Sequence, residues 1–223
     1  KATRKKFNLI TKFRTIPGCI GIYDILGKKH PVAEIEEIII GSNSLSTDDY
    51  IDCRVMNLII ETFYNDTMFE EVFGMLRTIN VSVMDCLIYI KNHSEIYSNK
   101  VKEIMKSYIF SATEDLYDTF EEANDYVLTP DIIDKYIGGN MGINELLVHR
   151  ALLLNEFDDI CDIMFKSIAG TLEKKDLLSN AIKDYLYDLK RFISILSANN
   201  SFPELLYCTL LYIFIKLFSK NKS

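Results

Sequence analysis

The hydrophobic pattern of the sequence changes at Ser46, and this change decides which elements can form on either side of it. Residues 1–45 are rich in Ile and Val and are interrupted by Gly and Pro, a pattern that predicts strands at Cys19–Ile25 and Val32–Ile40. From Ser46 onward, apolar residues recur at three- and four-residue spacing, which is typical of helices. We therefore expect a mainly α fold, with about eight helices in residues 46–223 preceded by a short β-hairpin or β-remnant in residues 1–45.

Local signals place the expected helices along the chain. Ser46 and Ser82 can each cap a helix with the side-chain hydroxyl, and Pro130 suits a first helical turn. Gly170 is expected to end the longest helix, because glycine is the usual residue after a helix C-terminus. The helices are expected at residues 46–65, 69–79, 82–92, 95–110, 113–126, 129–138, 143–168, 177–196 and from 201 onward.

The two expected strands cannot be stable alone, because an isolated pair of strands is marginal in water. We expect an exposed apolar surface around Cys19–Ile25 and Ile35–Ile40. Such a surface would be covered by an upstream sheet, or would lead to self-association through this segment. The helical residues 46–223 are expected to fold as a domain without the first 45.

Charge is distributed unevenly along the 223 residues, whose net charge is −7. The first 14 residues hold six basic side chains and no acid, whereas residues 15–223 hold 19 basic and 32 acidic side chains. An acidic body argues against non-specific binding to nucleic acid, which needs a basic surface along the phosphates. The basic start is either a small phosphate-binding patch or a solvated strand.

Five scattered cysteines and one apolar segment bear on the location of the chain. The cysteines have no CxxC spacing, which favours reduced thiols packed as small hydrophobic residues in a cytoplasmic protein. The segment Leu205–Phe218 is apolar, but it has 14 residues where a membrane span needs roughly 20. A buried terminal helix is therefore the favoured interpretation, and membrane contact is not expected.

The best local candidate for ligand contact is a glycine-rich loop before a predicted helix. Backbone N–H groups at such a position can approach an anion, and the candidate residues are Gly138, Gly139, Asn140, Gly142 and Asn144. The alternative is a plain turn between helices, since neither GxGxxG nor GxxxxGK[ST] is present. His149 is expected to be a satisfied interior or surface histidine. No catalytic, cofactor-binding or metal-binding residue is predicted in this chain.

Three segments of the chain resemble one known family, and a fourth segment later in the chain resembles it more weakly. They are Lys12–Gly18 (KFRTIPG), His30–Ser46 (HPVAEIEEIIIGSNSLS), a stretch from Tyr50–Asn57 to Glu61–Asp66, and Gly139–Leu146 (GNMGINEL). Their type and order resemble the region that follows the catalytic barrel in cobalamin (B12)-binding-domain radical S-adenosylmethionine proteins, which include proteins described as magnesium-protoporphyrin ester cyclase-like.

The resemblance implies a parent protein with a [4Fe–4S] cluster, S-adenosylmethionine and cobalamin, in which this chain is a helical tail. The sequence begins at Lys1 without an initiator Met, so we expect a carboxy-terminal fragment, with residues 1–45 a remnant of the upstream barrel. The family's CxxxCxxC motif is absent, and no cofactor is expected in the fragment itself. The expected role is an accessory domain that packs on the upstream catalytic domain and shapes substrate access. The alternatives are an independent helical module that binds a protein partner, and a ligand-binding bundle with its pocket near Gly138–Asn144.

Overall fold

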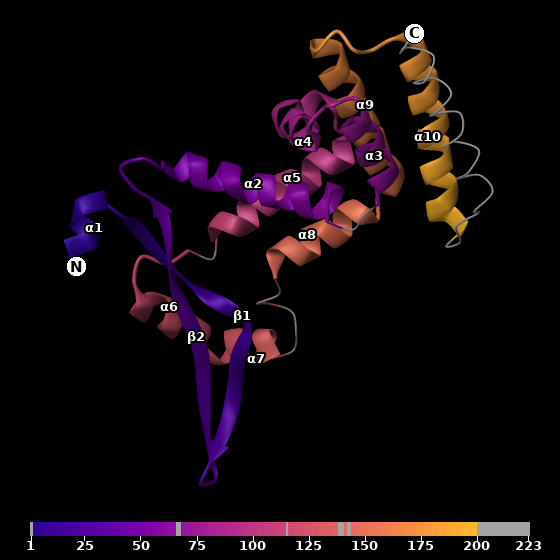
Figure 1. Cartoon of the computed structure of the whole chain (residues 1–223). Coiled ribbons are helices and arrows are strands. Elements are labelled where there is room, and N and C mark those ends of the chain that lie inside the picture. Colours follow the sequence, from indigo (N-terminus) through magenta and orange to yellow (C-terminus); the bar gives the residue numbers. More distant parts are fainter. Residues whose placement is uncertain (1, 66–67, 115, 138–140, 142–143, 200–223) are drawn as a thin grey trace. The chain divides into compact units, whose positions relative to one another are not determined.

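The computed structural model describes residues 2–65, 68–114, 116–137, 141 and 144–199 (Figure 1). The fold is 65% helical, and the described residues contain ten α-helices and one two-stranded antiparallel hairpin near the N-terminus. The expectation of a mainly α chain with a short β-hairpin is therefore confirmed. The predicted final helix, from Ser201 onward, lies outside the described residues.

Contacts between residues divide the chain into two units, which we describe separately. The first unit combines Lys1–Val55 with Glu103–Ala151, and the second combines Met56–Lys102 with Leu152–Ser223. This division differs from the boundary between residues 45 and 46 that the sequence pattern suggests, because helices from the middle of the chain pack with the N-terminal strands.

A long β-ribbon dominates the first unit. Strand β1 (Ile10–Ile25) pairs antiparallel with β2 (Lys28–Gly41), so both strands are longer than the predicted ones. They are joined at Leu26 (φ 53°) and Gly27 (φ 75°), which are both left-handed, as a type I′ hairpin turn requires. The Asp24 Oδ1 atom accepts a hydrogen bond from the backbone N–H of Gly27 at 3.0 Å and closes the turn.

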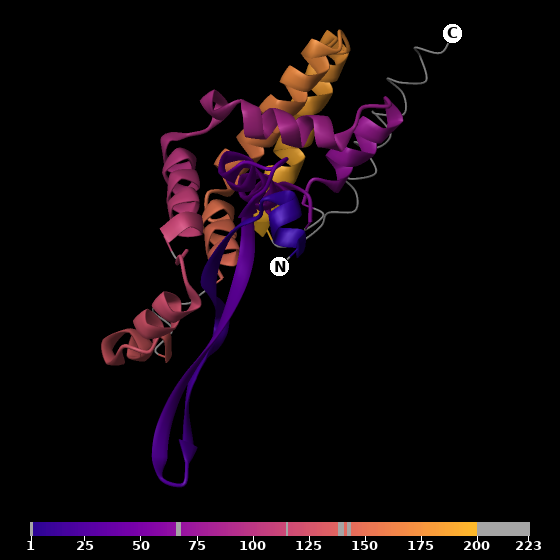
Figure 2. The same cartoon turned by 90° about the vertical axis from the view of Figure 1, so that its left-hand side faces the viewer.

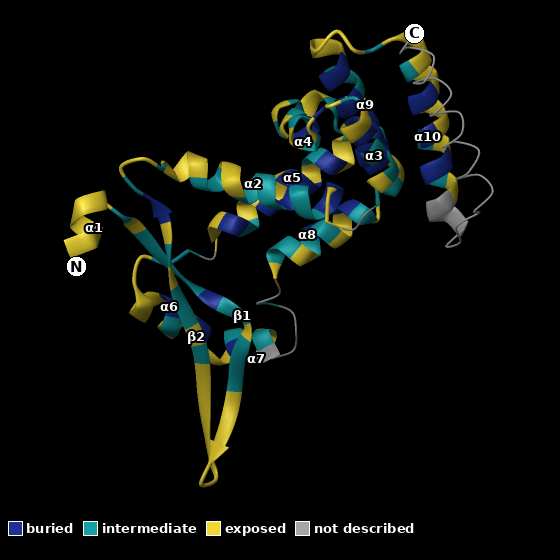
Figure 3. Cartoon of the chain, in the orientation of Figure 1, coloured by how far each residue is buried: buried dark blue, intermediate teal, exposed yellow. Residues whose placement is uncertain are grey.

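Two short helices cover only the base of this ribbon. Helix α6 (Phe120–Val127) packs against both strands, and α7 (Pro130–Ile137) packs against β1. The ring of Phe13 meets Phe120 edge-on, with centroids 6.5 Å apart. Beyond the base the ribbon continues as a two-stranded arm, in which residues 22–32 are exposed, while most residues of the base are buried or half-buried (Figures 2 and 3).

The other helical segments of the first unit come from four helices. They are α1 (Ala2–Phe7), the start of α2 (Thr47–Phe63), the second half of α5 (Asn99–Glu114) and most of α8 (Glu145–Leu154). Ser46 caps α2 as predicted: its Oγ accepts from the N–H of Asp49 at 3.1 Å, and the Asp49 carboxylate accepts from the N–H of Ser46 at 2.8 Å.

The second unit is a helical core around α9 (Phe157–Lys174). Helices α4 (Val83–Asn92) and α10 (Asn180–Asn199) both pack against α9, and α3 (Glu70–Thr78) packs against α4. A short 3₁₀ helix, η1 (Ser94–Ile96), links α4 to α5. Ser82 caps α4 as predicted. The fully buried side chains of this unit include Leu58, Phe73, Leu76, Ile90, Ile160, Met164, Ile168 and Leu172.

Three helix predictions were wrong. The expected helix over residues 143–168 is two helices, α8 and α9, separated by a turn at Asn155–Glu156. Gly170 does not end a helix, because α9 continues to Lys174. The expected helix over residues 113–126 starts only at Phe120, where Thr119 Oγ1 caps it by accepting from the N–H of Glu122 at 3.1 Å.

The expected apolar surface is present at the first strand and incomplete at the second. Ile22, Tyr23 and Ile25 are exposed, whereas Ile40 is buried and Ile38 is half-buried. Ile40 was therefore wrongly predicted to be exposed, because it lies at the covered end of the ribbon. In the part of the chain that the structure describes, no single helix could span a membrane; α3 and α4 pass the length and composition test only as a pair bent by 116°.

Candidate functional site

The predicted glycine loop is represented by one described residue of the five candidates. Gly138, Gly139, Asn140 and Gly142 lie outside the described residues. Asn144 is the N-cap of α8, and its Oδ1 accepts from the backbone N–H of Leu146 at 3.0 Å and of Leu147 at 3.4 Å. The side-chain oxygen of Asn144 therefore stabilises the start of a helix.

Glu145, the residue after this cap, belongs to a group of four charged side chains. We call this group the polar cluster, and its other members are Arg14, Glu36 and Arg54. The carboxylate of Glu145 forms an ion pair with Arg54 on α2 and lies 3.7 Å from Nη1 of Arg14 on β1. The Nε–H of Arg14 donates to Glu36 on β2 at 2.8 Å. Burial opposes the charge of Arg14, but the hydrogen bond and charge of Glu36, with the charge of Glu145, raise its pKa above the ordinary value.

Aromatic and imidazole groups line one side of the polar cluster. The guanidinium of Arg54 lies over the ring of Tyr108, 5.7 Å from its centroid, and the Tyr108 hydroxyl donates to the Arg54 carbonyl at 3.3 Å. Burial raises the pKa of the Tyr108 phenol. The ring of His149 meets that of Tyr108 edge-on, with centroids 5.3 Å apart.

His149 is buried, and both of its ring nitrogens have partners. Nδ1 lies 2.7 Å from the carbonyl oxygen of Glu145 and therefore donates, because a carbonyl can only accept. In the neutral ring this leaves Nε2 to accept from the hydroxyl of Ser107 at 3.2 Å. The prediction of a satisfied interior histidine is confirmed.

The composition of the polar cluster limits its chemistry. Two guanidinium groups face two carboxylates, so the formal charge is balanced and the group is not a receptor for an anion. Ser107 lies within α5, where backbone N–H groups are bonded along the helix, so the backbone at Ser107 offers no free pair of N–H donors for an oxyanion. The arrangement is suited to fixing α2 and α8 against the base of the ribbon.

Sequence reasoning did not identify the polar cluster, although a signal was present. Arg14 lies in Lys12–Gly18, Glu36 in His30–Ser46, Arg54 in Tyr50–Asn57 and Glu145 in Gly139–Leu146. Each of the four segments that carry the family resemblance therefore contributes one residue to the cluster. The opposite charges in these four segments could have been used to predict that their side chains lie close together in the fold.

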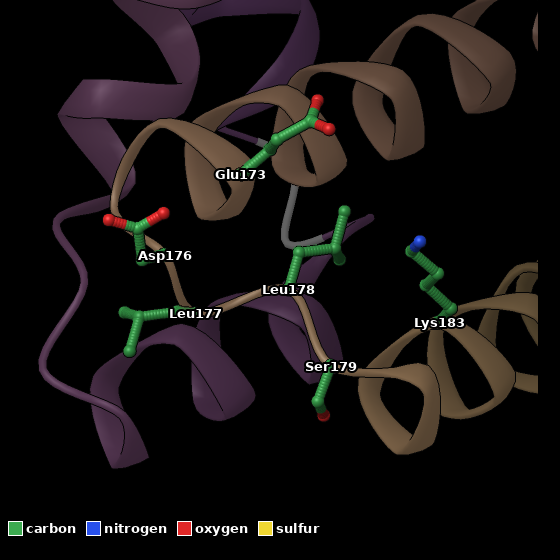
Figure 4. A pocket seen from close by; sticks show the side chains of 6 residues that line it. All are labelled: Glu173, Asp176, Leu177, Leu178, Ser179 and Lys183. Atoms are coloured by element: carbon green, nitrogen blue, oxygen red, sulfur yellow. The ribbon is translucent and has the colours of Figure 1, made fainter.

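Among the described residues of the second unit, two of the open hollows can be followed, and neither gathers a reactive set of groups. One, of about 320 Å³, lies between the end of α9 and the start of α10, where the charged ends of Glu173, Asp176 and Lys183 stand apart around it (Figure 4). The other, of about 380 Å³, lies along α10 and includes Tyr187 and Arg191. Neither includes a candidate residue from the glycine loop.

The described cysteines do not fit an iron–sulfur cluster, whose ligands must be convergent thiolates. Cys86 and Cys161 are fully buried, and burial raises the pKa of Cys86 to about 11 and of Cys161 to about 12. Cys53 is exposed on α2 and Cys19 is half-exposed on β1. Among the described residues, no three His, Cys, Asp or Glu side chains are placed to hold a metal ion.

Comparison with known proteins found no match: no family model, no curated protein and no solved structure matches the chain.

Proposed function

We propose that this chain is the helical accessory domain of a cytoplasmic radical S-adenosylmethionine enzyme that also binds cobalamin. In this proposal the cofactors are bound by an upstream catalytic domain of the same polypeptide, and the chain packs on its barrel and shapes substrate access. Nucleic acid is not a partner. The catalytic residues of the proposed enzyme lie in the upstream domain.

The polar cluster is the observation that carries this proposal. The resemblance rests on four segments that are spread over residues 12–146, and one charged residue from each joins the others through ion pairs in the first unit. The convergence of these segments supports the interpretation that the chain and the family build the base of the ribbon in the same way.

The arm of the ribbon provides a surface for packing on a catalytic domain. Exposed fractions are 41% for Ile22, 60% for Tyr23, 55% for Ile25 and 99% for Leu26. A two-stranded ribbon with apolar side chains exposed on both faces gains stability only when another element covers it. In the proposed enzyme, the barrel covers these side chains.

The test begins with the coding sequence that contains the chain. The proposal predicts a CxxxCxxC motif upstream in the same reading frame. The complete polypeptide, purified without oxygen, should show [4Fe–4S] absorption, bind cobalamin and cleave S-adenosylmethionine to 5′-deoxyadenosine. The double variant Tyr23→Ser/Ile25→Ser should lower substrate turnover while cluster absorption is retained. Met84→Ser/Ile88→Ser, which changes two exposed apolar residues of α4, is the matched control.

A reading frame that starts at the codon before Lys1, or a polypeptide that binds neither cofactor, would contradict the proposal. The alternative function would then be an independent helical module that binds a protein partner through the exposed arm.

A further inference from the structure

The arm is the part of the ribbon from Ile20 to Ala33, and an irregularity separates it from the base. The register of the β1–β2 pairing shifts between Thr15 and Ile20. Pro17 and the left-handed Gly18 (φ 76°) interrupt the regular pairing there. On the base side, α6 and α7 cover the strands. On the arm side, the only strand that β1 pairs with among the described residues is β2.

The position of Pro31 determines which backbone groups point out of the arm. Pro31 pairs with Ile22 in the ladder, but it has no N–H and cannot exchange two hydrogen bonds with Ile22. Ile22–Pro31 is therefore a non-hydrogen-bonded pair. By the alternation of an antiparallel ladder, Ile20, Ile22 and Asp24 direct their N–H and C=O groups to the outer edge of β1.

The two outer edges of the arm differ in their chemistry. The β2 edge is blocked, because Pro31 lacks an outward donor and Lys28 and Lys29 precede it on the strand. Proline and lysine protect natural edge strands in this way. The β1 edge carries Ile20, Ile22, Tyr23 and Ile25, and Asp24 is its one charged residue. This combination of β-forming, apolar and nearly uncharged residues favours the addition of a strand.

The same edge of β1 already accepts an added strand at the base. The N–H of Phe13 donates to the carbonyl of Tyr117 at 2.9 Å, and the N–H of Tyr117 donates to the carbonyl of Phe13 at 2.8 Å. Pairing along the arm would continue this edge beyond Pro17 and Gly18.

We infer that the β1 edge of the arm pairs with the β1 edge of a second copy of this chain. Antiparallel pairing about a two-fold axis at Ile22 places Ile22 opposite itself, Ile20 opposite Asp24 and Gly21 opposite Tyr23. This register makes about six backbone hydrogen bonds, two at each of three pairs. It puts no two like charges opposite one another, and it places a large ring against the residue that has no side chain.

The inference stands apart from the proposed function. It uses the backbone edge of the arm, and it leaves the side-chain faces free to pack on a catalytic domain. Its test uses this chain alone, so a monomer would overturn the inference and leave the cofactor test of the proposed function unaffected.

Sedimentation equilibrium of the chain and two variants tests the pairing. Ile22→Pro removes an outward N–H without removing a bond of the β1–β2 ladder, whereas the matched control Ile22→Thr keeps the N–H and lowers hydrophobicity. We expect a wild-type dimer, a dimer for Ile22→Thr, and a Kd at least about tenfold higher for Ile22→Pro, because each dimer loses two hydrogen bonds. A monomeric wild type, or equal weakening by both substitutions, would overturn the inference.

Residue-resolved hydrogen exchange gives a second measurement that does not depend on the folding of a variant. Raising the wild-type concentration should slow exchange at the amides of Ile20, Ile22 and Asp24. The amides of Gly21, Tyr23 and Ile25, which point into the ladder, should be protected at every concentration. Uniform slowing across all six amides, or no dependence on concentration, would count against edge pairing.

Discussion

The ring of Tyr89 on α4 occupies the space that a side chain on Gly170 of α9 would need. A Cβ built on Gly170 would lie 2.6 Å from Cε2 of Tyr89 and closer still to its Cζ and hydroxyl oxygen. Lys174, one turn further along α9, places its ammonium over the same ring at 4.6 Å from the centroid. The absence of a side chain at Gly170 therefore allows α4 and α9 to pack closely.

Gly170→Ala should destabilise the protein by about 2 kcal/mol, because the new methyl group overpacks the Tyr89 site and outweighs the gain in helix propensity. Gly74→Ala is the matched control. Gly74 also lies inside a helix, but the nearest atom to its Cβ position is 4.0 Å away, at the end of Arg77. This control should be stabilised by up to about 1 kcal/mol. Urea unfolding measures both, and equal effects would contradict the packing argument.

Glu145→Gln should destabilise the first unit by roughly 2 kcal/mol, because it leaves two half-buried guanidinium groups with one carboxylate fewer. Glu70→Gln is the control, since its ion pair with Arg77 is exposed and should contribute less than about 1 kcal/mol. Chemical unfolding followed separately in the two units distinguishes the outcomes. A Glu145→Gln variant as stable as Glu70→Gln would show that the polar cluster does not hold the base together.

The thiols should divide into two classes when the protein is treated with N-ethylmaleimide at pH 8. Cys53 is exposed and should react in the native protein, whereas Cys86 and Cys161 should react only in urea, because burial keeps them as protonated thiols. Peptide mass spectrometry reads each site. Since both folded pKa values are raised above the ordinary 9.0, the stability they confer is present below pH 9 and is lost as the pH rises through about 11 to 12.

The ion pair between Arg4 and Glu37 should make stability depend on pH in acid. Its hydrogen bonds lower the pKa of Glu37 from the ordinary 4.5 to about 2. A folded pKa below the ordinary one means that the stabilisation is present above pH 4.5 and is lost as the pH falls through 2. The difference in Tm between wild type and Glu37→Gln should shrink over that range. Arg4→Met should remove the same pH-dependent part of the stability. A difference in Tm between wild type and Glu37→Gln that stays constant with pH would contradict this prediction.

Local signals in the sequence predicted the helix ends that depend only on neighbouring residues. The caps at Ser46 and Ser82 and the start at Pro130 are confirmed, because each depends on a few adjacent atoms. The break at Asn155–Glu156 was missed, although Asn155 and the acidic pair Asp158 and Asp159 are ordinary signals of one helix ending and another beginning.

Features set by distant packing were not predicted from the sequence. Gly170 resembles a helix terminator until Tyr89, 81 positions earlier, is placed against it. The polar cluster likewise joins residues from four separate segments, and no spacing rule connects them. The predicted glycine loop can be followed only at Asn144, which proves to be a helix cap.

Hydroxyl-radical footprinting of the arm tests the central claim most directly. The complete polypeptide and this chain alone are labelled under the same conditions, with Tyr187, 63% exposed on α10, as the internal reference. If the arm packs on a catalytic domain, labelling of Tyr23 and Leu26 relative to Tyr187 should fall at least about threefold in the complete polypeptide, because their side chains leave water. Equal labelling of both residues in the two samples would contradict the account.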